Sequence, residues 1–335
     1  MERIAFIAGQ QLIGWSSVIL TLAAAATACL FLALYINRAD NMLAAFTAVP
    51  LAMVLSLFLS RLIHWYCYSE SYESFLQAVT DYSTGGYALV GAFAGCLLTA
   101  LLLRLTRVSD NLPEMVDCMC LAGAAGIAVG RLASLFNASD RGQMVESIRS
   151  MPWVYPVTNI TSGAVEYRLA TFLLQAMVAG ILFLILTAFY LTGKKRGLRD
   201  GDTALIFLLL YGASQIVLDS TRYDSMYFRS NGFVSVVQVM SLVAMVAAIG
   251  VFSVRMVKAR GLRKWYPALW AGILALIGCA GYMEYHVQRH GNEAVFAYSV
   301  MSVCLLLAAV LTLVIRYEAE HSLAELMKKL KKTGC

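Results

Sequence analysis

Apolar residues fill nine long runs of the chain, and short polar segments separate these runs. Each run is close to the roughly 20 residues that cross about 30 Å of hydrocarbon as a helix. The runs lie at about 13–36, 43–66, 84–104, 113–136, 169–192, 203–220, 233–254, 266–283 and 296–316. Lipid cannot hydrogen-bond the backbone of an open strand, so each run is predicted to be helical. The pattern predicts an all-α, polytopic membrane helix bundle of about nine transmembrane helices.

Composition supports a membrane protein and offers no sign of a cofactor. The chain is 60% hydrophobic and 14% charged, whereas a soluble domain carries about 25% charged residues. Its eight cysteines are scattered and lie mostly inside the predicted spans. This distribution is typical of buried structural cysteine rather than of a metal site. We expect no metal and no cofactor.

The lysines and arginines predict an orientation. Most of the 26 basic residues follow the first, third, fifth and seventh spans or lie in the carboxyl-terminal tail. The positive-inside rule therefore puts the amino terminus outside and the carboxyl terminus in the cytoplasm. The basic tail 326-LMKKLKKTG-334 is interpreted as an anchor on anionic membrane lipids. No nucleic-acid partner is expected.

Ionisable residues inside the predicted spans are the first functional candidates, because a charge at bilayer depth is costly. The last turns of the second span carry Arg61, about one helical turn from His64. Both are either functional or interfacial residues that snorkel to the surface. The fourth span carries Asp117, which could instead cap or pair near the inner end of its helix, and Arg131 at its outer end.

The sixth span carries a polar stripe. Tyr211, Gln215, Asp219 and Arg222 follow one another at four, four and three residues. That spacing predicts a single helical face that does not face lipid. The stripe is either part of a site or a set of interhelical hydrogen bonds.

Two arginines at outer span ends suggest a phosphate site. Guanidinium groups of Arg131 and Arg222, with Asn137 and Tyr211 as neutral donors, would suit a phosphate group. Phospholipid is the phosphate compound most available at that depth. The third span opens with two adjacent glycines, Gly85–Gly86, which either bring backbone close to a headgroup or allow close helix packing.

Four motifs, in this order, resemble those of the prolipoprotein diacylglyceryl transferase family. The segment 130-GRLASLFNAS-139, with Asp117 before it, is similar to the family signature G-R-x-G-N-F-x-N-G-E. The segment 85-GGYALVGA-92 is similar to G-G-x-x-F-H-G-G, and Tyr211 to Asp224 is similar to Y-x-x-x-R-x-x-x-E-x-x-R-x-P-D. The segment 232-GFVSVVQVMS-241 resembles G-x-x-S-x-x-Q-x-x-S, and part of the second span also fits, with Pro50, Arg61 and Tyr66 or Tyr68.

Several family residues are replaced. Val90 stands for the motif histidine, and Gln215 and Asp219 stand for the arginine and glutamate of the sixth span. Ser134 replaces the first signature asparagine, and Ser139 or Asp140 replaces its glutamate.

The resemblance implies a seven-span core in residues 1–255, followed in 256–335 by two additional helices and the basic tail. It implies transfer of the diacylglyceryl group of phosphatidylglycerol to the lipobox cysteine of a prolipoprotein signal peptide, in a bacterial inner membrane. Asp219 would orient an arginine or act as a base. Candidate catalytic residues are Arg131, Asn137, Tyr211, Asp219 and Arg222; candidate substrate-binding residues are Arg61, Gly85, Gly86, Ser134 and Asp140.

Two alternatives stay open at the level of sequence. Because of Val90 and Gln215, one is a catalytically impaired homologue that binds phospholipid or lipopeptide. The other is a small-solute transporter, although paired halves with interrupted helices, which would favour transport, are not seen.

Overall fold

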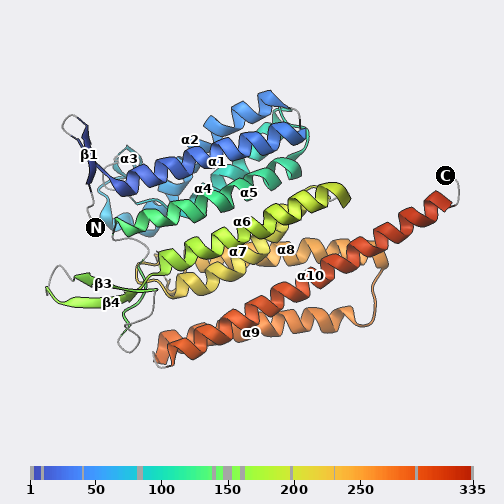
Figure 1. Ribbon diagram of the computed structural model, residues 1–335. Helices are drawn as coiled ribbons and strands as arrows, with labels where there is room; N and C mark the ends of the chain where they lie inside the picture. The colour runs from blue at the N-terminus through green and yellow to red at the C-terminus, as the bar shows by residue number, and fades with distance from the viewer. Residues whose placement is uncertain are drawn as a thin grey trace. The chain divides into compact units, whose positions relative to one another are not determined.

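The computed structural model describes residues 4–8, 11–39, 41–80, 86–137, 141–145, 153–158, 163–196, 199–229, 231–290 and 293–332. Long helices dominate these residues (Figure 1). They are α1 (Trp15–Ala39), α2 (Met42–Cys67), α4 (Leu89–Leu105), α5 (Leu112–Gly130), α6 (Thr171–Arg196), α7 (Asp202–Ser220), α8 (Val236–Arg260), α9 (Tyr266–His290) and α10 (Ala294–Lys332). The prediction of an all-α polytopic bundle is confirmed.

Eight helices within the described residues are long and apolar enough to cross a membrane. The ninth expected span is present as α4, which has 17 residues and therefore rises about 25 Å. The α4 helix begins at Leu89, five residues later than the predicted start of that span, because residues 86–88 are not helical.

Short elements connect the long helices. They are the 3-10 helices η1 (Ser69–Ser71) and η2 (Arg131–Leu135), the short helix α3 (Phe75–Thr80) and three antiparallel hairpins. The hairpins pair β1 (Ile4–Ala8) with β2 (Gln11–Gly14), β3 (Val154–Thr158) with β4 (Val165–Leu169), and β5 (Tyr227–Phe228) with β6 (Asn231–Ser235). The hydropathy pattern did not predict these strands.

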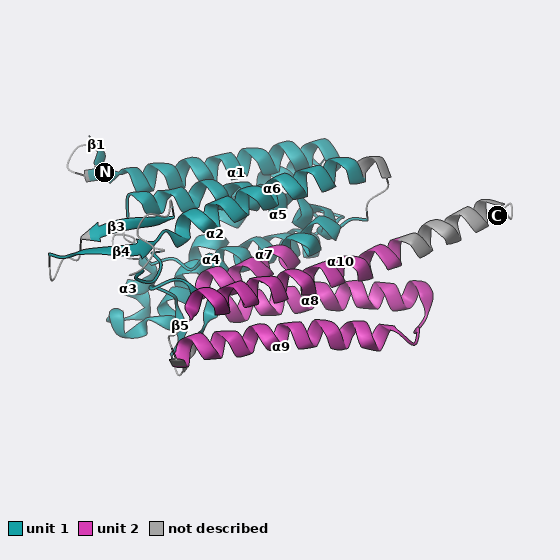
Figure 2. Ribbon diagram, turned by 60° about the horizontal axis from the view of Figure 1, so that its bottom comes forward, with its two compact units in different colours: residues 1–207, 221–237 teal, residues 208–220, 238–335 magenta. Residues whose placement is uncertain are grey.

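Two compact units make up the chain, as Figure 2 shows by colour. Unit 1 comprises residues 1–207 and 221–237, and unit 2 comprises residues 208–220 and 238–335. The α7 helix thus contributes its first turns to unit 1 and the remainder to unit 2. The division of the chain at residue 255 into a family-like core and an addition stays a prediction.

Small residues let the helices of unit 1 approach closely. A Cβ at Gly95 would meet the α2 backbone at Ser56 Cα at 2.5 Å. The Ser56 hydroxyl donates to the Ala92 carbonyl at 3.0 Å, and the Ser60 hydroxyl donates to the Ala88 carbonyl at 2.7 Å. For the glycines inside α4, close packing against α2 is the observed role. Elsewhere in unit 1, α5 packs between α1 and α6.

Unit 2 is built around α8, α9 and α10. The α9 and α10 helices pack along each other, and the Trp270 indole of α9 donates to the Ser253 hydroxyl of α8 at 3.1 Å. Arg260 at the end of α8 forms an ion pair with Glu318 of α10 at 2.5 Å.

Candidate functional site

Arg131 lies at the junction between α5 and the 3-10 helix η2. The η2 helix packs against α1 and α6, so the backbone of the signature segment is fixed by two neighbouring helices. The Arg131 residue is half-buried, Ser134 is 6% exposed, and Asn137 is exposed at the end of the segment. Arg131 and Asn137 are thus accessible in part at the end of α5, and their role in a site stays a prediction.

Arg222 does not belong to the helical stripe that its spacing predicted. The α7 helix ends at Ser220, and Arg222 instead pairs in antiparallel fashion with Gly142. The Gln143 amide donates to the Thr221 carbonyl at 2.9 Å, and the Tyr223 amide donates to the Arg141 carbonyl at 2.9 Å. The prediction of a shared helical face was wrong for Arg222, because strand pairing holds this segment after the helix has ended.

The same short segment also pairs with β4 on its other side. The Gly142 amide donates to the Leu169 carbonyl at 2.8 Å, and the Val145 amide donates to the Tyr167 carbonyl at 2.8 Å. Met144 forms an antiparallel bridge with Arg168. Residues 141–145 are therefore the central strand between residues 167–169 and 221–223.

This three-stranded arrangement carries three arginines, one from each strand. Arg168 binds Glu166 with N···O distances of 3.1 and 2.7 Å, and Arg222 binds Asp224 at 3.0 Å through both Nε and a terminal nitrogen. Arg141 donates to the Asn137 carbonyl at 3.4 Å. Its contact ties the strand to the signature segment that carries Arg131.

Arg141, Arg168 and Tyr155 were not among the sequence-predicted site residues. The Tyr155 hydroxyl is buried and has no hydrogen-bond partner within the residues that the structure describes. Burial raises the pKa of Tyr155, and the nearby Arg141 and Arg168 act against that rise. Tyr155 is therefore a neutral hydrogen-bond donor at neutral pH. The proximity of Tyr155 to Arg168 follows only from the β3–β4 register, which pairs these two residues.

Arg61 is buried, so the interpretation as a snorkelling interfacial residue is wrong. The residue is 2% exposed. Its Nε donates to the Ala78 carbonyl at 2.5 Å and a terminal nitrogen donates to the Gly86 carbonyl at 3.0 Å. The guanidinium also lies 5.3 Å from the ring centroids of Tyr72 and Tyr87. Arg61 thus connects α3 and the start of the third span to α2; its role in substrate binding stays a prediction.

Gly86 has φ +82°, a conformation that favours glycine. A Cβ at this position would meet the His64 ring, with Cε1 at 2.5 Å. Gly85 and Asp140, the other two predicted substrate-binding positions, lie outside the described residues.

The remaining residues of the predicted stripe belong to the part of α7 in unit 2. Tyr211 is 7% exposed, Gln215 is 1% exposed and Asp219 is fully buried. All three are shielded from lipid, as the stripe predicted. Gly212 packs beside them, because a Cβ there would come within 2.7 Å of the Ser241 carbonyl oxygen.

Asp117 caps the start of α7. Its two carboxylate oxygens accept hydrogen bonds from the Gly201 and Ala204 amides, each at 2.7 Å. Asp117 is fully buried, and the amides at a helix start need such an acceptor. The capping interpretation of Asp117 is therefore confirmed, and the helix that it caps is α7 rather than its own.

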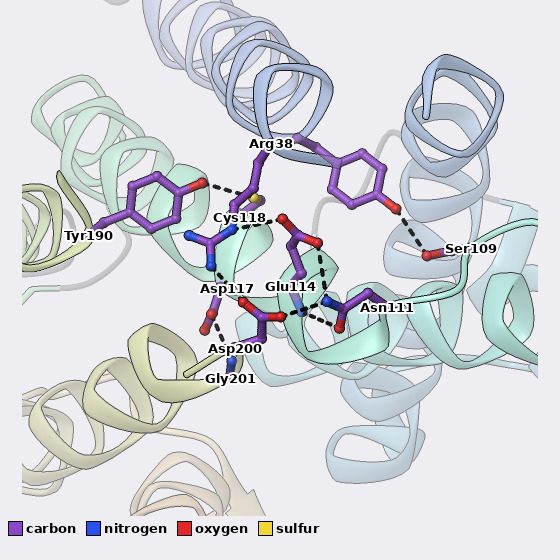
Figure 3. Close-up of polar contacts among 10 residues, drawn as sticks. Arg38, Ser109, Asn111, Glu114, Asp117, Cys118, Tyr190, Asp200 and Gly201 are labelled. Atoms are coloured by element: carbon purple, nitrogen blue, oxygen red, sulfur yellow. Dashed lines mark hydrogen bonds and ion pairs between the residues drawn. The ribbon is translucent and has the colours of Figure 1, made fainter. Parts of the chain in front are cut away.

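An ion-pair network surrounds this cap (Figure 3). Arg38, in the last turn of α1, binds Glu114 at 2.7 Å and Asp200 at 2.5 Å. The Asn111 amide donates to Asp200 at 2.7 Å, and the Arg38 guanidinium lies 5.0 Å from the Tyr190 ring centroid. The network joins the ends of α1 and α5 to the segment between α6 and α7. Arg38 and Asn111 each bind more than one partner, which is typical of a structural contact between helix ends.

Fold and site together define a class of protein: a polytopic membrane protein with an arginine-rich, strand-paired segment at the ends of its helices. A family model described as prolipoprotein diacylglyceryl transferase matches residues 3–254. The chain belongs to the prolipoprotein diacylglyceryl transferase family and is a bacterial multi-pass membrane protein. Residues 255–335 lie beyond the match.

Curated relatives carry the same description, phosphatidylglycerol–prolipoprotein diacylglyceryl transferase. The protein of Finegoldia magna is 26% identical over 202 residues, which are 60% of this chain and 73% of the relative. The protein of Bacillus licheniformis is 22% identical over 225 residues, 65% of this chain and 77% of the relative. The protein of Streptococcus equi subsp. equi is 25% identical over 202 residues, 60% of this chain and 73% of the relative.

Proposed function

We propose that this protein transfers the diacylglyceryl group of phosphatidylglycerol to the cysteine thiol of a prolipoprotein lipobox. The observation that carries the proposal is the pairing of Arg222 with Gly142 beside the segment that holds Arg131 and Asn137. Arg141, from the strand that pairs with Arg222, contacts the Asn137 carbonyl, so the paired strands meet the signature segment within unit 1.

The reaction needs cations where negative charge develops. The sulfur attacks the diacylglyceryl carbon that bears the phosphate ester, and a carbon–sulfur bond forms as the carbon–oxygen bond breaks. The bonding electrons leave with the oxygen, so glycerol phosphate departs with an additional charge. Arg131 and Arg222 would bind this phosphate, with Asn137 as a neutral donor, and would stabilise the leaving group. Asp224 holds the Arg222 guanidinium in a fixed orientation for that task.

Tyr211 and Asp219 keep their proposed roles as donor and as orienting carboxylate. Their burial supports a polar role inside the protein, since unpaired polar groups at this depth are costly. Ser134, in the signature segment, and Arg61, which binds the Gly86 carbonyl before α4, are buried; with Gly86 they are proposed to shape the headgroup site.

The proposed orientation follows from the basic residues. The Arg38 network, the segment between α8 and α9 and the carboxyl-terminal tail would face the cytoplasm, with the amino terminus and the paired strands outside. Single-cysteine labelling tests this: a cysteine at exposed Leu76, just after the outer end of α2, should react with an impermeant maleimide in intact cells. A cysteine at Leu262, which is 70% exposed, should react only after permeabilisation.

A second candidate is a homologue that binds phospholipid or lipopeptide without turnover. The specific observation in its favour is Val90, whose side chain cannot accept a proton where the family motif has histidine.

Complementation separates the two candidates. A bacterial strain depleted of its own transferase should grow when it expresses this protein and should fail when it expresses the Arg131→Ala variant. The control is Arg104→Ala, because Arg104 is 52% exposed and its contact with Asp110 is 3.9 Å long; this variant should support growth. Failure of the wild-type protein, at a membrane level equal to that of an active transferase, favours the binding homologue.

A further inference from the structure

The proposed transfer needs a base that the motif segment itself lacks. A thiol has a pKa near 8.5, and the thiolate is the reactive nucleophile. The ideal base titrates near neutral pH, which is typical of histidine. Among the four histidines of the chain, His64 alone lies in unit 1, the unit that holds Arg131 and Arg222.

His64 lies directly on the segment in which Val90 replaces histidine. A Cβ at Gly86 would come within 2.5 Å of His64 Cε1, 2.8 Å of Nδ1 and 2.9 Å of Nε2. Gly86 opens this segment and has the positive φ that suits glycine. The His64 imidazole, on the last turn of α2, therefore covers Gly86, near the start of the segment that carries Val90 instead of histidine.

The ring of His64 has a fixed orientation. Nδ1 and the Tyr72 hydroxyl are 2.9 Å apart and share a hydrogen bond. The rings of Tyr68 and Tyr72 lie 4.9 and 5.9 Å from the imidazole centroid. When Nδ1 donates to Tyr72, Nε2 carries the lone pair that accepts a proton. The charged neighbour on the same helix is Arg61, one turn away.

Tyr68 connects His64 to the strand that carries Arg222. Its hydroxyl donates to the Ser225 carbonyl at 3.5 Å. Burial raises the pKa of Tyr68, Asp224 raises it further and Arg222 lowers it, so Tyr68 lies within electrostatic reach of both. Tyr68 thus contacts the His64 imidazole with its ring and the backbone three residues after Arg222 with its hydroxyl.

We propose that His64 is the general base of the transfer: Nε2 takes the thiol proton as the sulfur attacks, and the imidazolium then returns that proton to the departing glycerol phosphate. Tyr72 is the positioning residue that holds the ring through Nδ1. The proposal rests on the proposed diacylglyceryl transfer and adds a base to it.

The test compares two acceptor peptides with purified full-length protein and phosphatidylglycerol in mixed micelles. One lipobox peptide carries cysteine, and the other carries selenocysteine, whose selenol is already ionised at neutral pH. His64→Gln should lower kcat for the cysteine peptide by about 100-fold or more, the contribution typical of a general base, and leave KM for phosphatidylglycerol unchanged. With the selenocysteine peptide, the same variant should lower kcat by less than about tenfold.

The outcomes are distinct. The ratio of the two peptide rates is measured on one preparation, so it does not depend on the fraction of the variant that folds. If His64→Gln lowers kcat equally with both peptides, or lowers it with neither, the role of His64 as a base is overturned. Absence of transfer by the wild-type protein overturns the proposed function itself. The matched control His286→Gln, on α9 of unit 2, should show wild-type rates with both peptides.

Discussion

The backbone of Arg222 is paired with that of Gly142, and this relationship places a predicted helical residue on a strand. The hydrogen bonds that flank the pair, from Gln143 to Thr221 and from Tyr223 to Arg141, are each 2.9 Å long. The position of Arg222 therefore depends on the strand at 141–145 rather than on the end of α7. Substitutions in that strand should affect the arginine without touching it.

Replacement of Gly142 by alanine should displace this strand. A Cβ at Gly142 would lie 2.5 Å from Leu169 Cβ and 2.6 Å from the Leu169 carbonyl oxygen, and a backbone atom cannot move aside. A shift of about 1 Å in a site can cost about 100-fold in rate, so Gly142→Ala should lower transfer by that order. The control Gly123→Ala adds a Cβ that meets nothing within 4 Å; an equal loss in both variants would contradict the pairing as the cause.

Asp224 should act as a positioning residue for Arg222. The Arg222 side chain is 11% exposed and binds Oδ1 of Asp224 at 3.0 Å. Asp224→Asn keeps an oxygen acceptor and should retain transfer within about threefold, whereas Asp224→Ala should lower it by about tenfold, since a misdirected donor stabilises the leaving group poorly. Initial rates at saturating phosphatidylglycerol measure the difference. Equal rates for the two variants would exclude the positioning role.

Tyr155 and Tyr35 provide a matched pair for stability. The Tyr155 hydroxyl is buried without a hydrogen-bond partner among the described residues, whereas the Tyr35 hydroxyl and the Ser109 hydroxyl are 3.0 Å apart and hydrogen-bonded. Tyr35→Phe should therefore reduce the free energy of unfolding by about 1 kcal/mol, and Tyr155→Phe should leave it unchanged or raise it. Thermal unfolding in detergent without phospholipid measures both. A larger loss for Tyr155→Phe would show that its hydroxyl is hydrogen-bonded.

The cap at the start of α7 should stabilise unit 1. Asp117→Ala removes the acceptor of two amide hydrogen bonds and leaves buried donors unpaired, at a cost of about 2 kcal/mol or more. Asp117→Asn keeps one carbonyl oxygen as an acceptor and should reduce the free energy of unfolding by less than Asp117→Ala does. Asp110→Asn serves as the control because the Asp110 side chain is 96% exposed. If all three variants unfold at the wild-type temperature, Asp117 does not stabilise the helix start.

The helices could be predicted from the sequence because apolar runs in lipid have only the helical solution. The same rule explains why Asp117 and the residues Tyr211 to Asp219 were expected away from lipid. The sixth apolar run was predicted to end at residue 220, and α7 does end at Ser220. The position of Arg222 could not be predicted, since its spacing from Asp219 continues the helical pattern and only its pairing with Gly142 shows that it lies beyond the helix.

Contacts between distant segments account for most of what the sequence did not reveal. The spacing of Arg61 and His64 on α2 suggested a shared role at the membrane interface, but Arg61 is buried against Ala78 and Gly86. The His64 ring covers Gly86, a neighbour 22 positions along the chain. Arg141 and Arg168 were counted only as charges, because hairpin register cannot be derived from their sequence positions.

The proposed function is that this chain joins a diacylglyceryl group to a thiol. The most direct measurement incubates purified protein with phosphatidylglycerol and a lipobox peptide, and quantifies both products by mass spectrometry. We expect diacylglyceryl thioether peptide and glycerol phosphate in equal amounts, with both lost in Arg131→Ala and retained in Arg104→Ala. Wild-type protein that binds phosphatidylglycerol but forms neither product would contradict it.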